Sequence, residues 1–176
     1  MAAVASSYNI EQVRKEWIGK KGPRTHGRYP VEYDPIRRHC HMCGSTNPLF
    51  LDPEYAKTTK YGTVIAPAIM ADNFAGNGPW PPTDRAAGEM LTPPTPGSRN
   101  INLNTSWEFL KPIKVGDRLS GQSEVEDIYE KPIRLDPRSV WIVTKRTIYN
   151  QDGDVVAIGR TTLCKHRTPE EVAADK

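Results

Sequence analysis

The sequence predicts an α+β fold in which a curved antiparallel sheet packs against one buried helix. Helix signals are confined to the first half of the chain, whereas the second half contains four segments with the composition and alternation of strands. Helices followed by a run of antiparallel strands are typical of this fold class. At 176 residues the chain is long enough for one domain with a hydrophobic core, and short for two.

Two short helices are expected near the start of the chain. Asn9 is expected to cap a helix over residues 10–17, because its side chain accepts hydrogen bonds from free amides of the first turn. Asp34 and Pro35 fit the cap and the first position of a second helix. That helix is expected to end near residue 43, where Gly44 can adopt a left-handed backbone conformation.

The helix expected to lie in the core starts at Pro67 and ends before Gly76. Ile69, Met70 and Phe74 recur at helical spacing along it, which predicts that all three are largely buried. Six prolines follow in residues 77–99, so that segment is expected to be a long loop rather than a helix or a central strand.

Four strands are expected in the second half of the chain. Gly153 lies in the sequence NQDGD, which is a strong signal for the turn of a hairpin between the last two strands. Ala157 and Gly159 are small and share one face of the last strand, so a helix is expected to pack closely there. Residues 166–176 are expected to form a polar tail. The expected strands cover residues 101–110, 118–129, 139–149 and 154–165.

Composition excludes several classes of function. The net charge is only +3 and the basic residues are scattered, which does not indicate nucleic-acid binding. No apolar run approaches the length of a membrane span, and the first residues lack the apolar core of a signal peptide. Cys40, Cys43 and Cys164 do not form an even disulfide framework, so a cytoplasmic protein is expected.

Four segments occur in the order and spacing of a known family. They are GSTNPLFLDPEYA (44–56), YGTVIAPAIM (61–70), WEFLKPIKVGDRLS (107–120) and NQDGD (150–154). Together they resemble the MaoC-like (R)-specific enoyl-CoA hydratase and dehydratase family, in particular the subgroup similar to the N-terminal dehydratase half of fatty acid synthase. The resemblance implies a single hot-dog domain over residues 1–165, with a curved antiparallel sheet wrapped around a central helix.

The loop that carries catalysis in this family differs here at its two decisive positions. Active members read Gly-Asp-x-Asn-Pro-x-His, and the Asp and His act together on a water molecule and the substrate α-carbon. Gly44, Asn47 and Pro48 fit that pattern, but Ser45 stands at the Asp position and Phe50 at the His position. Proton transfer near neutral pH requires groups such as a carboxylate and an imidazole. The resemblance therefore implies no catalytic residue in this chain.

The resemblance further implies a role in a heteromeric enzyme. The chain is expected to be the non-catalytic subunit that forms the acyl pocket of an enoyl-CoA hydratase or 3-hydroxyacyl thioester dehydratase. A related hot-dog subunit is expected to supply the Asp–His pair, in a heterodimer or heterotetramer. The substrate would be a thioester of coenzyme A or of acyl carrier protein, and no cofactor is expected. The residues expected to bind substrate are Ala66, Pro67, Ala68, Ile69, Asn73 and Trp80.

Two alternatives remain open at this point. The first is a homodimeric hot-dog protein that binds an acyl thioester or another hydrophobic ligand without catalysis. The second is a hydratase with relocated chemistry, which uses His39, His41 or a metal at Cys40 and Cys43. A single CxxC motif supplies only two of the four ligands of a structural zinc site. On a helix the two cysteines would share one face and could both be small buried side chains.

Overall fold

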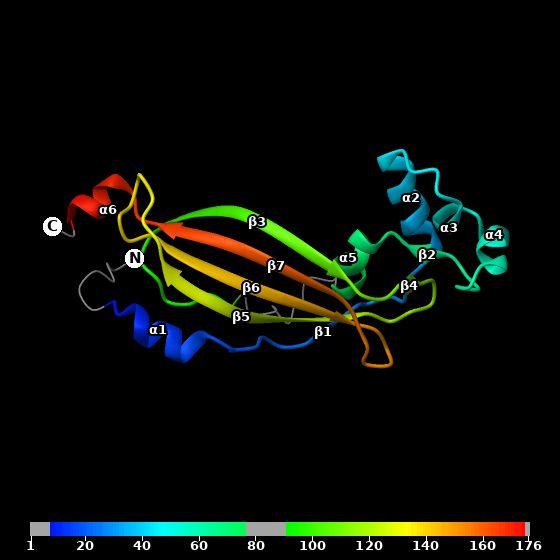
Figure 1. Cartoon of the computed structure of the whole chain (residues 1–176), viewed down its shortest axis with the longest axis horizontal. Helices are drawn as coiled ribbons and strands as arrows, with labels where there is room; N and C mark the ends of the chain where they lie inside the picture. Colours follow the sequence, from blue (N-terminus) through cyan, green and yellow to red (C-terminus); the bar gives the residue numbers. More distant parts are fainter. Residues whose placement is uncertain (1–7, 77–90, 175–176) are drawn as a thin grey trace.

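The computed structural model describes residues 8–76 and 91–174. Its main feature is a five-stranded antiparallel sheet with the order β1-β5-β6-β7-β3 (Figure 1). The strands of this sheet are β1 (Thr25–His26), β3 (Arg99–Phe109), β5 (Ser120–Glu130), β6 (Val140–Tyr149) and β7 (Val155–His166). A second, two-stranded sheet pairs β2 (Ile65–Ala66) with β4 (Ile113–Lys114).

The helices gather at the two ends of the long sheet. Figure 1 shows α1 along one end, and α2, α3 and α4 together in a lobe beyond the other end, with α5 between this lobe and the sheet. None of the helices in the described ranges has the length and apolar composition that a membrane span requires. The helical segments are α1 (Ile10–Trp17), α2 (Tyr33–Cys43), α3 (Pro48–Leu51), α4 (Pro53–Thr58), the 3₁₀ turn η1 (Ala68–Met70), α5 (Ala71–Ala75) and α6 (Pro169–Ala174).

The four long strands confirm the prediction from alternation and turn signals, with ends that differ by one or two residues. The hairpin between β6 and β7 forms as expected, because Gly153 adopts a φ of 85° and Asn150 accepts a hydrogen bond from the amide of Asp154 at 2.9 Å. The sequence did not reveal β1, β2 and β4, because two residues are too few for an alternating pattern. A bulge between Val125 and Asp127 also interrupts the expected alternation of β5.

The start of the second helix differs from the prediction. Glu32, not Asp34, stands at the cap position, and α2 begins at Tyr33. Asp34 lies in the first turn, where its carboxylate pairs with Arg37 at 2.7 Å and with Arg38 at 2.6 Å. An acidic side chain in the first turn interacts favourably with the helix dipole. An aspartate therefore suits the first turn, where Asp34 lies, as well as the cap position that was predicted for it.

The central helix is shorter and less regular than expected. Pro67 precedes the 3₁₀ turn η1, which leads into α5, and Gly76 follows the last helical residue as predicted. Met70 is buried, but Ile69 is 54% exposed, so its predicted burial was wrong. A 3₁₀ turn has about three residues per turn instead of 3.6, which turns Ile69 away from the face that regular α-helical spacing would bury.

Both α1 and α5 cover the same face of the sheet, which we call the helix-bearing face. Asp72 of α5 pairs with Arg146 of β6, while Val13 of α1 packs in one apolar cluster with Ile142 of β6. Alternate residues of a strand point to the same side. Ile142 and Arg146 therefore lie on one face, with α1 toward one end of it and α5 toward the other.

The apolar core follows this division and consists of two clusters. The larger cluster joins α2, α5, β2 and β4 to the end of the sheet marked by Ile148 and Ala157. The smaller one joins α1 to the opposite end, around Val125, Val140 and Ile142. Polar residues of β5, β6, β7 and β3 lie between the two clusters.

The small residues of the last strand have a different neighbour from the one predicted. We expected a helix to pack on Gly159, but the indole of Trp107 from the adjacent strand β3 covers it. A Cβ atom at position 159 would lie only 2.8 Å from the ring. The absence of a side chain thus makes room for Trp107, and the prediction of a helix at this position was wrong.

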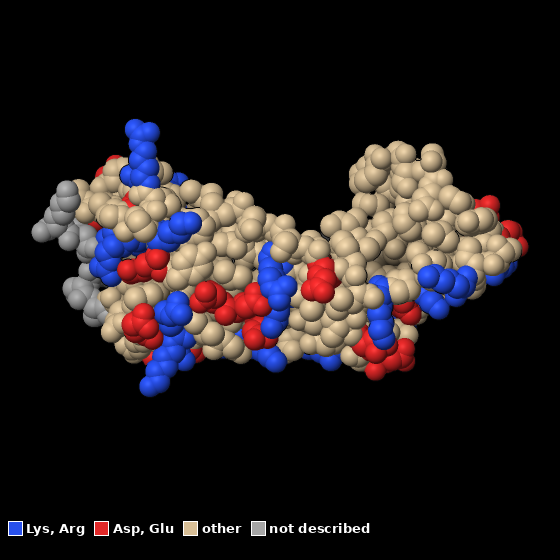
Figure 2. All heavy atoms as spheres, in the orientation of Figure 1, with Lys and Arg blue, Asp and Glu red and all other residues tan. Residues whose placement is uncertain are grey.

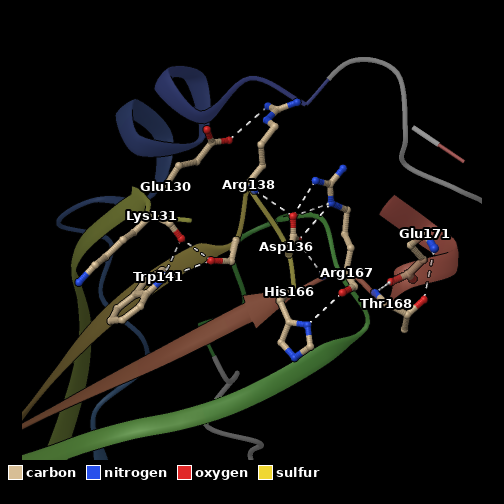
Figure 3. A network of polar contacts seen from close by, with 10 residues as sticks. Glu130, Lys131, Asp136, Arg138, Trp141, His166, Arg167, Thr168 and Glu171 are labelled. Atoms are coloured by element: carbon tan, nitrogen blue, oxygen red, sulfur yellow. Dashed lines mark hydrogen bonds and ion pairs between the residues drawn. The ribbon is translucent and has the colours of Figure 1, made fainter. Parts of the chain in front are cut away.

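The segment after residue 165 is structured, in contrast to the expected polar tail. His166 ends β7, and the next residue, Arg167, forms a buried ion pair with Asp136 at 2.7 Å (Figure 3). The same carboxylate accepts hydrogen bonds from the backbone amides of Arg167 at 2.8 Å and Arg138 at 2.9 Å. These bonds tie the loop between β5 and β6 to the start of the segment that leads into α6.

This ion pair makes a prediction about acid stability. Burial by itself would raise the pKa of Asp136, but the hydrogen bonds from Arg167 and the backbone outweigh it and lower the pKa from 3.8 to about 2. A carboxyl with a lowered pKa stabilises the fold above its unfolded pKa, and this stability is lost as the pH falls through the folded pKa. Urea titrations of the chain between pH 4 and pH 2 should show a loss of roughly 2 kcal/mol from this group.

The Asp136→Asn variant should be destabilised at neutral pH by about 3 kcal/mol, because it removes the carboxylate that pairs with the buried Arg167 guanidinium. It should also lose the part of the acid dependence that Asp136 contributes. Glu130→Gln is the control, since it breaks the more exposed pair of Glu130 with Arg138 and should cost below about 1 kcal/mol. Equal effects of the two variants would contradict a special role for Asp136.

Candidate functional site

The loop from Gly44 to Leu51 keeps a defined shape through local hydrogen bonds. Gly44 ends α2 with a φ of 67°, and the amide of Ser45 donates to the carbonyl of Cys40 at 2.8 Å. The Asn47 side chain caps α3 by accepting from the amide of Leu49 at 3.0 Å, and Pro48 occupies the first helical position. The Asn-Pro pair that fits the family pattern therefore has a structural role here that needs no catalytic partner.

The two positions of the family dyad carry no acid or base in this structure. Ser45 is half-buried, and its side chain hydrogen-bonds with the thiol of Cys40. Phe50 lies in α3 and packs against the larger apolar cluster, which includes Ala66 and Met70. Phe50 thus lies in the same cluster as Ala66 and Met70 at the entry to the central helix, and its side chain contributes apolar contact instead of a proton.

The predicted substrate-binding residues fall into a buried and an exposed group. Ala66 is buried in β2 and pairs with Ile113 of β4, whereas Ile69 and Asn73 are exposed to solvent. Pro67 and Ala68 are half-buried between them. The structure brings this segment close to α3, as the resemblance implied, while its role toward a substrate stays a prediction.

Trp80, the last of the predicted substrate-binding residues, lies outside the described residues. The amides of Ala68 and Ile69 open the helical segment and so have no acceptor within it. In active members of the family that the chain resembles, backbone amides at this place are expected to stabilise negative charge on a thioester oxygen. The geometry of the backbone is compatible with that role, and the residues next to it supply no proton.

Three contacts that the sequence did not reveal hold α5 in place. Arg146 of β6 pairs with Asp72 of α5 through a short ion pair. The Thr25 hydroxyl donates to the carbonyl of Ala75 at 3.3 Å. Gly27 allows β1 to approach closely, because a Cβ atom there would lie 2.0 Å from the carbonyl oxygen of Phe74. All three join residues far apart in the chain, so no local pattern could indicate them.

The CxxC motif does not form a paired thiol site. Cys40 is fully buried in the larger apolar cluster, whereas Cys43 is exposed and its Sγ atom lies 3.7 Å from Nε2 of His39. The expectation that both cysteines are buried on one face was therefore wrong for Cys43. In residues 8–76 and 91–174, no three or more His, Cys, Asp and Glu side chains are placed to hold one metal ion.

The different environments of the cysteines predict different reactivity. Burial raises the pKa of the Cys40 and Cys164 thiols, and both are closed to solvent, whereas Cys43 is exposed. Because the thiolate is the reactive form, a thiol reagent should modify only Cys43 in the native chain and all three cysteines after unfolding. Mass spectrometry of iodoacetamide-treated protein measures this. Rapid labelling of Cys40 under native conditions would contradict the structure.

The sequence also matches a described protein family. A model of the FAS1-like dehydratase domain region matches residues 16–158, which is most of the chain and includes the loop and the central helix. The chain belongs to this family. Its hot-dog fold is therefore that of a family of hydratases and dehydratases.

Two of the relatives are described as enoyl-CoA hydratases, and four are described as UPF0336 proteins. The chain is 31% identical over 170 residues to a probable enoyl-CoA hydratase alpha subunit of Thermomonospora curvata. This match covers 92% of the chain but only 53% of the relative, so the chain spans about half of that protein's length. An (R)-specific enoyl-CoA hydratase of Aeromonas caviae is 29% identical over 119 residues, covering 66% of the chain and 73% of the relative.

Solved structures agree with the fold. The ChsH1-ChsH2 complex of Mycobacterium tuberculosis contains a chain that matches with a TM-score of 0.69, covering 92% of this chain and 95% of that one at 16% identity. The unliganded R-hydratase PhaJ1 of Pseudomonas aeruginosa matches with a TM-score of 0.57 at 21% identity, covering 85% and 82%. At such identities the likeness shows the hot-dog fold alone.

Proposed function

We propose that this chain is the non-catalytic, acyl-pocket-forming subunit of a heteromeric enoyl-CoA hydratase or 3-hydroxyacyl thioester dehydratase. The observation that carries the proposal is the pairing of an intact family scaffold with Ser45 and Phe50 at the dyad positions. A second hot-dog chain with the Asp–His pair supplies the proton transfers. This chain contributes the helix entry at Ala66–Ile69 and the surface that receives the acyl group.

The exposed edge strand β3 supports the proposal that this chain binds a partner chain. Among residues 8–76 and 91–174, only β7 is hydrogen-bonded to β3 as a neighbouring strand, and nearly all residues of β3 are exposed, on both faces. An uncovered edge strand with apolar side chains is a ready surface for pairing with another chain. The exposed large apolar side chains on this strand and directly after it are Ile101, Leu103, Phe109 and Leu110.

The shape of the molecule places this edge next to a hollow. In Figure 2 the upper outline is notched between the sheet and the lobe of α2, α3 and α4, and Figure 1 places β3 along the same side. The surface over β3 is largely uncharged, since its only charged residues are Arg99 and Glu108. A partner of similar shape paired along β3 would lie on the side of the molecule where this notch opens.

The names of related proteins support the same arrangement. One relative is described as an alpha subunit, and two of the matching solved structures are complexes of hot-dog chains, ChsH1-ChsH2 and HadBC, both from Mycobacterium tuberculosis. HadBC is described as a 3R-hydroxyacyl-ACP dehydratase. We transfer to this chain the principle of two different subunits, and not the substrate of either complex.

A hydration assay on the separate chain and on its native complex tests the proposal. The purified chain alone should not hydrate crotonyl-CoA or longer 2-enoyl-CoAs, because a serine without a base and a phenylalanine cannot transfer protons. The same chain, recovered with its partner by mild affinity purification from its native host, should be active. Robust activity of the isolated chain would contradict the proposal, as would an inactive complex with a second hot-dog chain.

Two leucine variants provide matched controls for the interface. Leu103 on β3 is 42% exposed and Leu135 in the loop between β5 and β6 is 53% exposed. Leu103→Lys should lose the partner and the activity, since it places a charge in the interface, while Leu135→Lys should keep both. If the chain is a homodimeric binding protein instead, Leu103→Lys will produce a monomer and no second hot-dog chain will be recovered from the host.

A further inference from the structure

Three threonines form a row across the helix-bearing face. Thr144 of β6 lies opposite Thr161 of β7, and Thr161 lies opposite Thr105 of β3. The hydroxyls of Thr105 and Thr161 are 3.3 Å apart, within hydrogen-bond distance. In the described part of the chain, no group forms a hydrogen bond with the Thr144 hydroxyl. Residues directly opposite in a ladder share one face, so these hydroxyls line one side of the sheet.

The next row of the ladder is polar on β5 and β6, and it ends with Trp107 on β3. Ser123 of β5 lies opposite Arg146 of β6, which in turn lies opposite Gly159 under the Trp107 ring. Arg146 pairs with Asp72 of α5, and its Nη1 atom is 3.4 Å from the Ser123 hydroxyl. The charge of Arg146 is therefore already neutralised by a carboxylate. This row presents oxygen and nitrogen atoms but no unpaired charge.

We call the two rows together the polar band, which comprises Thr105, Ser123, Thr144, Arg146 and Thr161. The band separates the two apolar clusters, since Ile148 belongs to one cluster and Ile142 to the other, on either side of Thr144 and Arg146 in β6. Thr105 is exposed, and the other four residues are half-buried. A closed hydrophobic core would place apolar side chains here.

The chemistry of the band restricts what it can bind. A plain alkyl chain laid across it would displace water from the hydroxyls without replacing the hydrogen bonds, which weakens binding. A group with a carbonyl or hydroxyl oxygen would restore those bonds, because threonine hydroxyls both donate and accept. A carboxylate is not favoured, since Arg146 is already paired with Asp72.

We infer that the polar band recognises a neutral oxygen, a ketone or a hydroxyl, on the acyl group of the thioester. This inference rests on the proposed function and deepens it by naming the substrate class: oxygen-bearing acyl groups instead of plain alkyl chains. The apolar clusters on either side contact the hydrocarbon parts. Thr144 and Thr161, at the centre of the band, are the residues that determine this specificity.

The test uses the complex of this chain with its native partner and a matched set of thioesters. Titration calorimetry measures the dissociation constants of 2-decenoyl-CoA and of its analogues with a ketone at carbon 7, 8 or 9. At least one ketone should bind about 5- to 10-fold tighter than the plain chain, as expected for one added hydrogen bond. The double variant Thr144→Val, Thr161→Val should remove this difference, so that the ketone and the plain chain bind with equal dissociation constants.

The control is Thr162→Val, the next residue of β7 on the opposite face, which is also half-buried. It should preserve the preference for the ketone. Equal binding of all the thioesters, or a preference that survives in the double variant, would overturn this inference while the proposed function stands. Failure of the complex to bind any of the thioesters would overturn the proposed function, and this inference with it.

Discussion

The position of Arg146 constrains much of the molecule. Its guanidinium projects from β6, in the middle of the sheet, and pairs with Asp72 of α5 while it approaches Thr25 of β1 and Ser123 of β5. This one side chain therefore joins the helix that follows the candidate site to three strands of the sheet. Gly121 leaves room for it, since a Cβ atom there would lie 2.6 Å from the guanidinium. In most protein cores apolar packing alone holds a helix against a sheet, whereas here the ion pair between Arg146 and Asp72 also contributes.

The loop from Gly44 to Leu51 keeps a defined shape although its two dyad positions carry no acid or base. Asn47 and Pro48 start α3 through backbone geometry and a cap, and neither depends on the residues at the dyad positions. Phe50 adds apolar contact to the core where a catalytic histidine would have required a polar setting. The shape of this loop therefore does not depend on an acid or a base at these two positions.

Sequence reasoning succeeded where the physical signal is local. The four long strands follow from alternation, and the hairpin from Gly153. It failed where distant segments decide the outcome. The cover of Gly159 by Trp107 and the buried pair of Asp136 with Arg167 each join segments that local patterns treat separately. The polar band likewise appears only when the registers of four strands are known. The burial of Ile69 was predicted wrongly for another reason, because the helical segment begins there as a 3₁₀ turn.

Native mass spectrometry, after mild affinity purification of this chain from its host, tests the central claim most directly. The account predicts a heteromeric assembly in which this chain is bound to a second chain of the hot-dog family, and sequencing of that chain should show Asp and His at the positions held here by Ser45 and Phe50. A homodimer or a monomer, with no such partner under gentle conditions, would contradict the view of this chain as half of an enzyme.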